Sequence, residues 1–301
     1  MNQDLLKAIP ETTNIKTVNN ETGRIVQEDA GEKGVSTKKE LKHSRVDWDT
    51  DRPRIILYAD IMGFKAKLAQ TPHDKVVKEL RKFVVAVSRH LSPYQTGGHL
   101  RMTLFSDLIV IASDSDSLKN FKLIINAAAA LLHECHAFKF PINGCIAKGA
   151  LAFDEAETIA TMAVGSNENI MQAITQGRKG QYMPLFVGKS IVDAYLLNEE
   201  MFFYGIVLHQ TAEPLLYDYR KIGPAQLPFY KIPVPLKTGG KANLYYLDWP
   251  QIKLAKNTCS QQDILDYLNN LEPKVGVRPR AYIYNTIKII EAIENLKNSK
   301  H

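Results

Sequence analysis

Residues 54–65 read RIILYADIMGFK, an apolar run that ends in an acidic residue and a glycine turn. Isoleucine, leucine and tyrosine dominate the run, which predicts a buried β-strand. Asp60 ends this strand, and Gly63-Phe64-Lys65 follows at the expected turn into a helix. A carboxylate at the end of a core strand needs a partner, because burial disfavours its charged form. That partner must come from another segment of the chain.

The segments around this strand predict an alternation of helices and strands. The order strand, helix, strand, strand, helix, strand favours a ferredoxin-like α+β fold, with the first strand beside the 104–112 hairpin. The expected elements are a helix over His73–His90, two strands turning around Ser106-Asp107, a helix over 117–138 capped by Ser117, and a strand over 140–153 broken by Gly144 and Gly149.

The remaining segments suggest three regions. Residues 1–50 are polar and without periodicity, so we expect a flexible arm. Residues 51–255 form the predicted catalytic domain, and residues 256–301 a helical extension with helices near 261–271 and 279–297. Within the domain we expect a helix-bearing insertion over 154–181, a strand over 182–188 leading to a helix from Lys189, and further strands over 205–209, 231–236 and 243–249.

Composition narrows the class of protein. Apolar residues make up 45% of the 301 residues, no run of them is long enough to span a membrane, and the first residues lack a secretory signal. The three cysteines have no CxxC spacing, which favours free thiols in the cytoplasm over a zinc site. The net charge of +6 is spread along the chain, which suits an anionic ligand better than a nucleic acid. No Walker A, GxGxxG or Ser-His-Asp signature is present.

Asp107 is the candidate partner of Asp60. It lies at the tip of the predicted hairpin, which the topology puts beside the first strand. Two carboxylates there would repel each other, and a pair of divalent cations would compensate; oxygen ligands suit Mg²⁺ or Mn²⁺. Gly63 allows backbone N–H groups to approach a phosphate, and Lys65 adds positive charge. The alternative is that either aspartate only caps a turn.

These motifs resemble those of class III nucleotidyl cyclases. YADIMGF and, 47 positions later, FSDLIVI resemble the paired metal motifs of that family. NGCIAKGAL, FVGKSIVDAYLLNEE and VPLKTGGKANLYYLDW resemble its later elements, so the resemblance covers about residues 53–249. It implies a class III cyclase domain in which two Mg²⁺ or Mn²⁺ ions are bound by Asp60, Asp107 and the backbone of Ile61. The triphosphate would be held by Gly63, Phe64, Lys65 and Lys237, and the ribose 3′-hydroxyl would attack the α-phosphate.

The chain differs from the family pattern at the positions that bind the nucleotide base and stabilise the transition state. Thr103 and Leu185 stand where purine cyclases carry their base-reading Lys and Asp, and Val192 and Leu196 replace a transition-state Asn and Arg. Asn143 stands where an Arg is expected. The chain is therefore either an inactive, cyclase-like nucleotide-binding or interaction module, or a cyclase that reads another base.

The form G-x-x-x-V-D-A-Y-x-L over residues 188–197 resembles the bacterial pyrimidine cyclases of Pycsar anti-phage systems. That resemblance implies a uridylate or cytidylate cyclase, with UTP favoured over CTP, whose cyclic product signals to a separate effector. It also implies a head-to-tail homodimer, with the aspartates of each site from one chain and the base-binding Thr103 and Leu185 from the other. The choice between UTP and CTP, the effector and the activating signal stay open.

Overall fold

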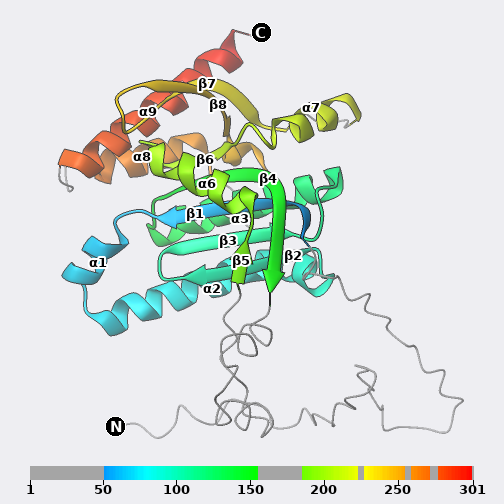
Figure 1. Cartoon of the computed structure of the whole chain (residues 1–301). Coiled ribbons are helices and arrows are strands. Elements are labelled where there is room, and N and C mark those ends of the chain that lie inside the picture. Colours follow the sequence, from blue (N-terminus) through cyan, green and yellow to red (C-terminus); the bar gives the residue numbers. More distant parts are fainter. Residues whose placement is uncertain (1–50, 155–184, 223–226, 255–258, 272–276, 300–301) are drawn as a thin grey trace, which may run out of the picture. The chain divides into compact units, whose positions relative to one another are not determined.

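The computed structural model describes residues 51–154, 185–222, 227–254, 259–271 and 277–299 (Figure 1). All of them belong to one compact unit, His43–His301. The predicted arm over 1–50 and all but the first residue of the predicted 154–181 insertion lie outside the described residues. The division between a catalytic domain and an extension at residue 255 stays a prediction.

The described strands and helices follow the order expected for the first half of the chain. The strands are β1 (Arg52–Ile61), β2 (Leu100–Phe105), β3 (Leu108–Ser113), β4 (Ile142–Asp154), β5 (Leu185–Val187), β6 (Gly205–Leu208), β7 (Phe229–Pro235) and β8 (Lys241–Leu247). The helices are α1 (Phe64–Gln70), α2 (His73–Thr96), α3 (Leu118–Phe138), α6 (Lys189–Glu200), α7 (Glu213–Ile222), α8 (Gln261–Leu271) and α9 (Val277–Asn298), with a 3₁₀ turn η2 (Trp249–Gln251).

The sheet confirms the predicted ferredoxin-like α+β fold. Its strand order is β2-β3-β1-β4-β6-β8-β7, and β5 pairs separately with the far end of β4. β1 is antiparallel to both β3 and β4, as the ferredoxin-like βαββαβ connection requires. The parallel pairing of β4 with β6 then extends the sheet toward the β7–β8 hairpin. The first strand thus lies in the interior of the sheet, between the hairpin and β4.

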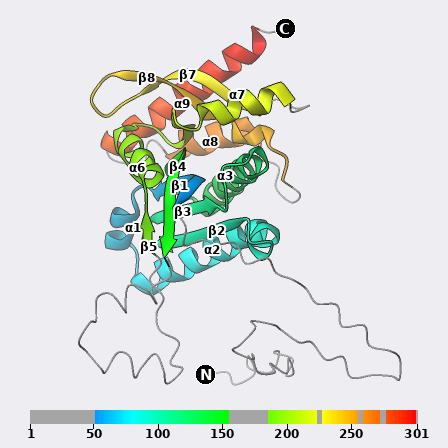
Figure 2. The same ribbon diagram turned by 45° about the vertical axis from the view of Figure 1, so that its right-hand side comes forward.

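Two layers of side chains cover the sheet. Along β1, Ile55, Leu57 and Ala59 pack in the core that α2 and α3 share, while Ile56 belongs to a second core under α6. This alternation is what a strand buried on both faces produces. Figure 2 shows the sheet between α3 on one side and α6 on the other. Asp60 follows Ile56 and Tyr58 at the same period of two, so it belongs to the face that α6 covers.

The predicted break of the fourth strand at its glycines is wrong, because β4 runs through both of them. At each glycine another part of the chain approaches the strand closely, so that a side chain would clash at Gly144 and be crowded at Gly149. A Cβ at Gly144 would lie 2.8 Å from the Tyr58 carbonyl oxygen, and one at Gly149 would lie 3.3 Å from the Ser190 nitrogen. These glycines therefore allow close packing and do not end the strand.

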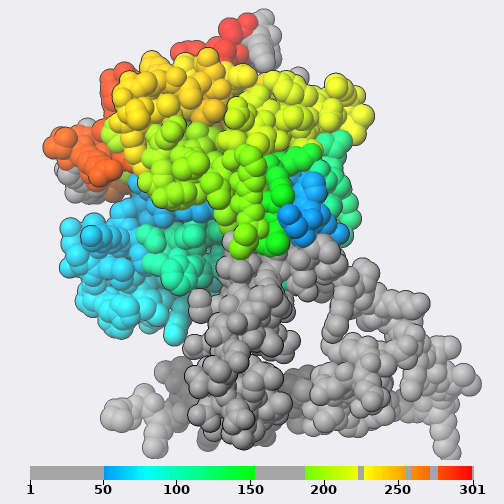
Figure 3. All heavy atoms as spheres, in the orientation of Figure 1, coloured from blue at the N-terminus to red at the C-terminus, as the bar shows by residue number. Residues whose placement is uncertain are grey.

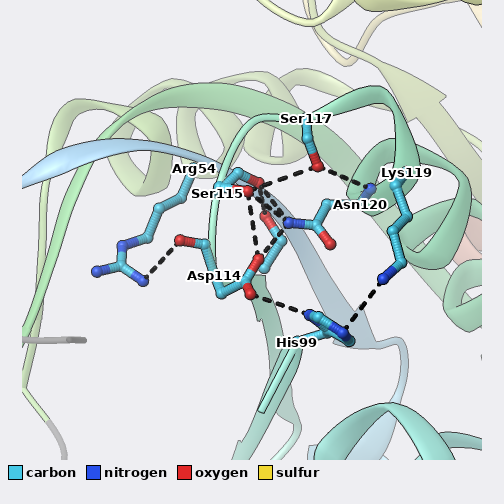
Figure 4. A network of polar contacts seen from close by, with 8 residues as sticks. Arg54, His99, Asp114, Ser115, Ser117, Lys119 and Asn120 are labelled. Atoms are coloured by element: carbon cyan, nitrogen blue, oxygen red, sulfur yellow. Dashed lines mark hydrogen bonds and ion pairs between the residues drawn. The ribbon is translucent and has the colours of Figure 1, made fainter. Parts of the chain in front are cut away.

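The start of α3 is held by a polar network at the end of the sheet opposite Asp60 (Figure 4). Ser117 caps the helix, as predicted, by accepting a hydrogen bond from the Asn120 N–H at 3.3 Å. The Asn120 side chain in turn donates to Asp114, which also contacts His99 at 3.0 Å. The network joins the ends of β2 and β3 to α3.

Two helices and one strand differ from the expectations. α2 extends past the predicted end at His90 to Thr96 and includes Pro93, which cannot donate a helical hydrogen bond. α7 was not predicted, because its amphipathic pattern covers only ten residues. The strand predicted over 182–188 is described only as the three-residue β5. The predicted helices near 261–271 and 279–297 are confirmed as α8 and α9. No helix in the described ranges is long and apolar enough to cross a membrane.

Candidate active site

The hairpin connection brings Asp60 and Asp107 together, as the sequence predicts. Asp60 is in register with Leu108, the residue that follows Asp107. The next backbone group, the Ile61 N–H, donates to the Asp107 carbonyl oxygen at 2.9 Å. Ser106 makes the tight turn possible by adopting a left-handed conformation with φ of 58°. One hydrogen bond therefore fixes the tip of the hairpin against the end of β1.

The electrostatics of Asp60 indicate an unsatisfied cluster of negative charge. Burial, the Asp107 carboxylate and the Glu199 carboxylate, in that order, raise the pKa of Asp60 from 3.8 to about 6. The Lys237 ammonium opposes them and lowers this pKa. The repulsion between neighbouring carboxylates is what a divalent cation would relieve.

Two residues of α6 that sequence reasoning did not assign to the site also lie near Asp60. The ring of Tyr195 meets that of Tyr58 edge-to-face, with centroids 6.0 Å apart. Glu199 follows one turn later on α6, is exposed, and acts on both Asp60 and Tyr58. Burial, Asp60 and Glu199 together raise the pKa of Tyr58 to about 12, so this phenol keeps its proton. The spacing of Tyr195 and Glu199 on one helix face was the only signal available in the sequence.

Asn143 contributes a further oxygen next to Asp60. It is the cross-strand partner of Asp60 on β4, so the two side chains share a face of the sheet. Asn143 is only 1% exposed, and its Oδ1 has no hydrogen-bond partner within the described part of the chain. An unpaired buried oxygen of this kind costs about 1–3 kcal/mol unless a donor or a cation satisfies it.

The donor set fits a hard divalent cation. Carboxylate oxygens from Asp60 and Asp107, with the amide oxygen of Asn143 close by, are ligands that Mg²⁺ and Mn²⁺ prefer. Among the residues that the structure describes, no group of three or more His, Cys, Asp or Glu side chains could hold a metal ion. Any such site therefore depends on the two aspartates together with amide or backbone oxygens, and the backbone of Ile61 stays a predicted ligand.

The predicted phosphate-binding residues near the end of β1 differ in their burial and in the element that carries them. Gly63 has φ of 74°, a left-handed conformation that favours glycine, and directly precedes α1. Phe64 is buried in the core, so only its backbone could contact a phosphate, while Lys65 is exposed on α1. Lys237 lies in the exposed β7–β8 loop, and its N–H donates to the Glu200 carbonyl oxygen at 2.8 Å. The end of α6 thus holds this loop on the side of Asp60.

The two predicted base-binding positions do not lie together beside Asp60. Thr103 pairs with Val110, which pairs with Tyr58, so Thr103 lies two strands away from β1 on the same face. Leu185 pairs with Asp154 at the opposite end of β4 from Asn143. One chain therefore does not bring Leu185 to its own Asp60.

The face around the site carries exposed apolar side chains. On α6, Val192 is 51% exposed, Tyr195 45% and Leu196 55%. Phe105, two residues before Asp107, is 76% exposed at the hairpin tip. α6 lies on the molecular face seen in Figure 3, in yellow-green near its centre. Large apolar side chains exposed close together are typical of a surface that contacts another molecule.

The two histidines of α3 pack against aromatic rings. His133 meets Trp249 edge-to-face at a centroid distance of 4.4 Å, and His136 meets Tyr267 at 5.3 Å. Burial is the largest cause that lowers the pKa of each, to about 4 for His133. Both histidines therefore pack α3 against its neighbours, His133 against η2 and His136 against α8.

The raised pKa of Asp60 predicts a pH-dependent stability difference. A folded-state pKa of about 6 against an ordinary 3.8 means that the folded protein holds this proton more tightly than the unfolded chain. The corresponding stability is complete below pH 3.8 and is lost as the pH rises through about 6. The asparagine of Asp60→Asn does not ionise, so this variant should not share the loss of stability. The difference in free energy of unfolding between Asp60→Asn and wild type should therefore grow as the pH rises from 3.8 to about 6, and stay constant at higher pH.

Urea denaturation with EDTA at several pH values between 4 and 7 measures this difference. Asp218→Asn is the matched control, because that aspartate is exposed on α7 and should show no such trend. A difference between Asp60→Asn and wild type that does not vary with pH would contradict the raised pKa.

Comparisons with known proteins give only distant similarities. No protein-family model matches the chain, and no curated protein sequence matches it significantly.

Three solved structures are similar over much of their length. A bacterial light-regulated adenylyl cyclase has 11% identity and a TM-score of 0.44, covering 66% of this chain and 92% of that one. The dimeric guanylyl cyclase domain of the RhoGC fusion protein from the fungus Blastocladiella emersonii has 11% identity and a TM-score of 0.44, covering 65% and 96%. The adenylyl cyclase CyaB from P. aeruginosa has 10% identity and a TM-score of 0.41, covering 70% and 98%. The sequence identities and TM-scores of all three structures are low, so the chemistry of the site is inferred from its own residues.

Proposed function

We propose that the protein is a metal-dependent pyrimidine nucleotide cyclase, which converts UTP or CTP into the 3′,5′-cyclic nucleotide and pyrophosphate. The observation that carries this proposal is the convergence of Asp60 and Asp107 at the end of β1, where the pKa of Asp60 is raised. A strand end that accumulates carboxylates without an equal number of cationic side chains is suited to binding cations and, through them, a triphosphate.

The residues of the chain have separate tasks in this reaction. Asp60 and Asp107 would hold the ions, and the buried Asn143 oxygen beside Asp60 would serve as a further oxygen ligand. Two divalent ions held there would offset the charge of the triphosphate and favour loss of the proton from the ribose 3′-hydroxyl. Lys237 and the N–H groups of the Gly63 turn bind phosphate oxygens and orient the α-phosphate for in-line attack.

A head-to-tail homodimer is part of the proposal. Leu185 lies at the opposite end of β4 from the residues around Asp60, so a base pocket that contains Leu185 needs a second chain to reach the aspartates. The exposed apolar residues of α6 and Phe105 lie around the site and supply a surface for that contact. A dimer would cover these side chains and close the site at the same time.

The pyrimidine preference and the biological setting rest on the sequence motifs. Thr103 and Leu185 offer one hydroxyl and no charge where a purine enzyme carries a Lys and an Asp. The motif over residues 188–197 resembles the Pycsar cyclases, so we propose a second-messenger synthase in anti-phage defence whose product acts on a separate effector. UTP is favoured over CTP on the same resemblance.

One observation favours a non-catalytic alternative. Val192 and Leu196, which replace the transition-state Asn and Arg of related cyclases, are exposed on α6 and have no hydrogen-bonding group. A cyclase-like dimer that binds a nucleotide without turning it over would also show the paired aspartates.

Incubation of the purified protein with each of the four nucleoside triphosphates and Mn²⁺, followed by pyrophosphate measurement and mass spectrometry, separates the two functions. A pyrimidine cyclase releases pyrophosphate and a cyclic nucleotide in equal amounts. Binding of a nucleotide without either product, under conditions where a known cyclase is active, would favour the non-catalytic module.

A further inference from the structure

A cavity lies between the C-terminal helices and the end of the sheet that carries Asp60. It has a volume of about 60 Å³, is open to the surface on one side, and is bounded by α3, α8 and α9 and the first residues of β4 and β6. In Figure 2, α8 lies between α3 and α9. The cavity is distinct from the aspartate pair, because Asp60 and Asp107 do not line it.

The lining of the cavity selects for an uncharged, aromatic occupant. The rings of Phe140, Tyr204, Tyr246, Trp249 and Tyr267 all border it. None of its described lining residues is an Asp, Glu, Lys or Arg, so the walls themselves carry no charged side chain. The ammonium groups of Lys67 and Lys139 lie outside the lining, 4.7 Å and 4.4 Å from the ring centroids of Phe140 and Tyr267. Aromatic walls favour edge-to-face contact with a further ring, and an apolar cavity tends to stay free of water.

Two phenols provide a polar group for such a molecule. Tyr204 and Tyr267 line the cavity, and neither hydroxyl forms a hydrogen bond within the described residues. Burial raises the pKa of Tyr267 to about 12, so its hydroxyl remains a neutral donor. An engineered cavity of about 150 Å³ holds benzene, so this smaller but open cavity suits a single ring that is only partly enclosed.

The wall of the cavity is joined directly to the candidate active site. Pro141 and Ile142 line it; the Pro141 carbonyl oxygen accepts the Met62 N–H at 2.7 Å, and Ile142 is in register with Ile61. These contacts hold the backbone that runs from Asp60 into the Gly63 turn. A ligand packed against this wall would restrict the motion of that backbone segment.

A second connection runs through α9. Thr286 lines the cavity, and its Oγ1 accepts the Tyr204 N–H at 2.8 Å and donates to the Tyr282 carbonyl oxygen at 2.7 Å. Gly205 follows Tyr204 and is in register with Asn143, the partner of Asp60. This second chain of contacts runs from β6 through β4 to Asp60.

We propose that this cavity binds a small uncharged aromatic molecule of about one ring, and that its binding stiffens the backbone turn after Asp60. The ligand would act as an effector at a site separate from the aspartates. The binding step does not depend on cyclase activity, so it can be tested whether or not the protein turns over a nucleotide.

The test uses 4-fluorophenol as the probe on the full-length protein, with ¹⁹F NMR to measure binding and 4-fluorobenzoate as the charged counterpart. Leu268→Phe, on α8, fills the cavity; Leu265→Phe is the matched control, because Leu265 lies on the same helix and does not line the cavity. We expect saturable binding of 4-fluorophenol to wild type and to Leu265→Phe, weakened by about tenfold or more in Leu268→Phe as the added ring occupies the space.

Hydrogen exchange of the Met62 amide tests the connection to Asp60. With 4-fluorophenol bound, this exchange should slow in wild type and in Leu265→Phe, and should be unchanged in Leu268→Phe. If Leu268→Phe fails to fold, nuclear Overhauser contacts between the probe and the Trp249 indole locate the bound ring instead. The proposed site would be overturned if 4-fluorophenol showed no saturable binding, if 4-fluorobenzoate bound equally well, if Leu268→Phe bound the probe as well as wild type does, or if the bound probe made no contact with Trp249. The proposed connection to Asp60 would be overturned if the probe bound without slowing exchange of the Met62 amide.

Discussion

Replacing either Asp60 or Asp107 by asparagine should reduce cyclic nucleotide formation by about 10³-fold, because bound ions contribute several kcal/mol of charge stabilisation to such a reaction. The fold should remain intact in both variants. Removing one of two repelling carboxylates relieves the electrostatic strain that raises the pKa of Asp60, so neither substitution takes away a stabilising contact of the metal-free protein.

Turnover with saturating Mn²⁺, Mn²⁺ affinity by titration calorimetry, and thermal unfolding should be measured on the same preparations. Asp218→Asn is the matched control, since it makes the same chemical change at an exposed position on α7 and should leave turnover and Mn²⁺ affinity as in wild type. If both active-site variants kept more than a small fraction of wild-type turnover, the two aspartates would not be the metal ligands.

The preference for a pyrimidine base should be at least about 100-fold in kcat/KM, on the scale that a site built around specific hydrogen bonds reaches. A purine presents a longer polar edge, and related purine enzymes read it with a Lys and an Asp. Thr103 and Leu185 leave that edge without charged partners. A bound purine would then bury polar groups that have no hydrogen-bond partner, and the free-energy cost of doing so would favour the pyrimidine.

Competition among the four triphosphates, read by mass spectrometry of the cyclic product, measures this preference. The double substitution of Lys at Thr103 and Asp at Leu185 should lower pyrimidine turnover without creating a purine enzyme, since the length of the pocket is set elsewhere. Thr103→Ser keeps the hydroxyl and should remain close to wild type. Cyclic AMP or cyclic GMP as the main product would end the pyrimidine assignment.

Local sequence patterns were sufficient for most of the secondary structure. The apolar run of β1, the turn at Ser106-Asp107 and the cap at Ser117 each depend on neighbours within a few residues, and all three are confirmed. α7 was missed, because its amphipathic pattern is short. The glycines of β4 were misinterpreted, because the segments that approach them come from Tyr58 and Ser190, far away in the sequence.

The sequence by itself determined that two acidic residues end neighbouring strands, since each lies directly after or before an apolar run whose pairing follows from the order of elements. The tertiary structure decided what surrounds them. Glu199 and Tyr195 meet Asp60 and Tyr58 only because α6 packs across β1, and Asn143 faces Asp60 only through the register of β4. Leu185 proved to lie at the far end of β4, and the aromatic cavity exists only because α8 and α9 fold back beside α3. Contacts of this kind join residues far apart in the chain, and their geometry is set by packing of whole elements, which no local pattern encodes.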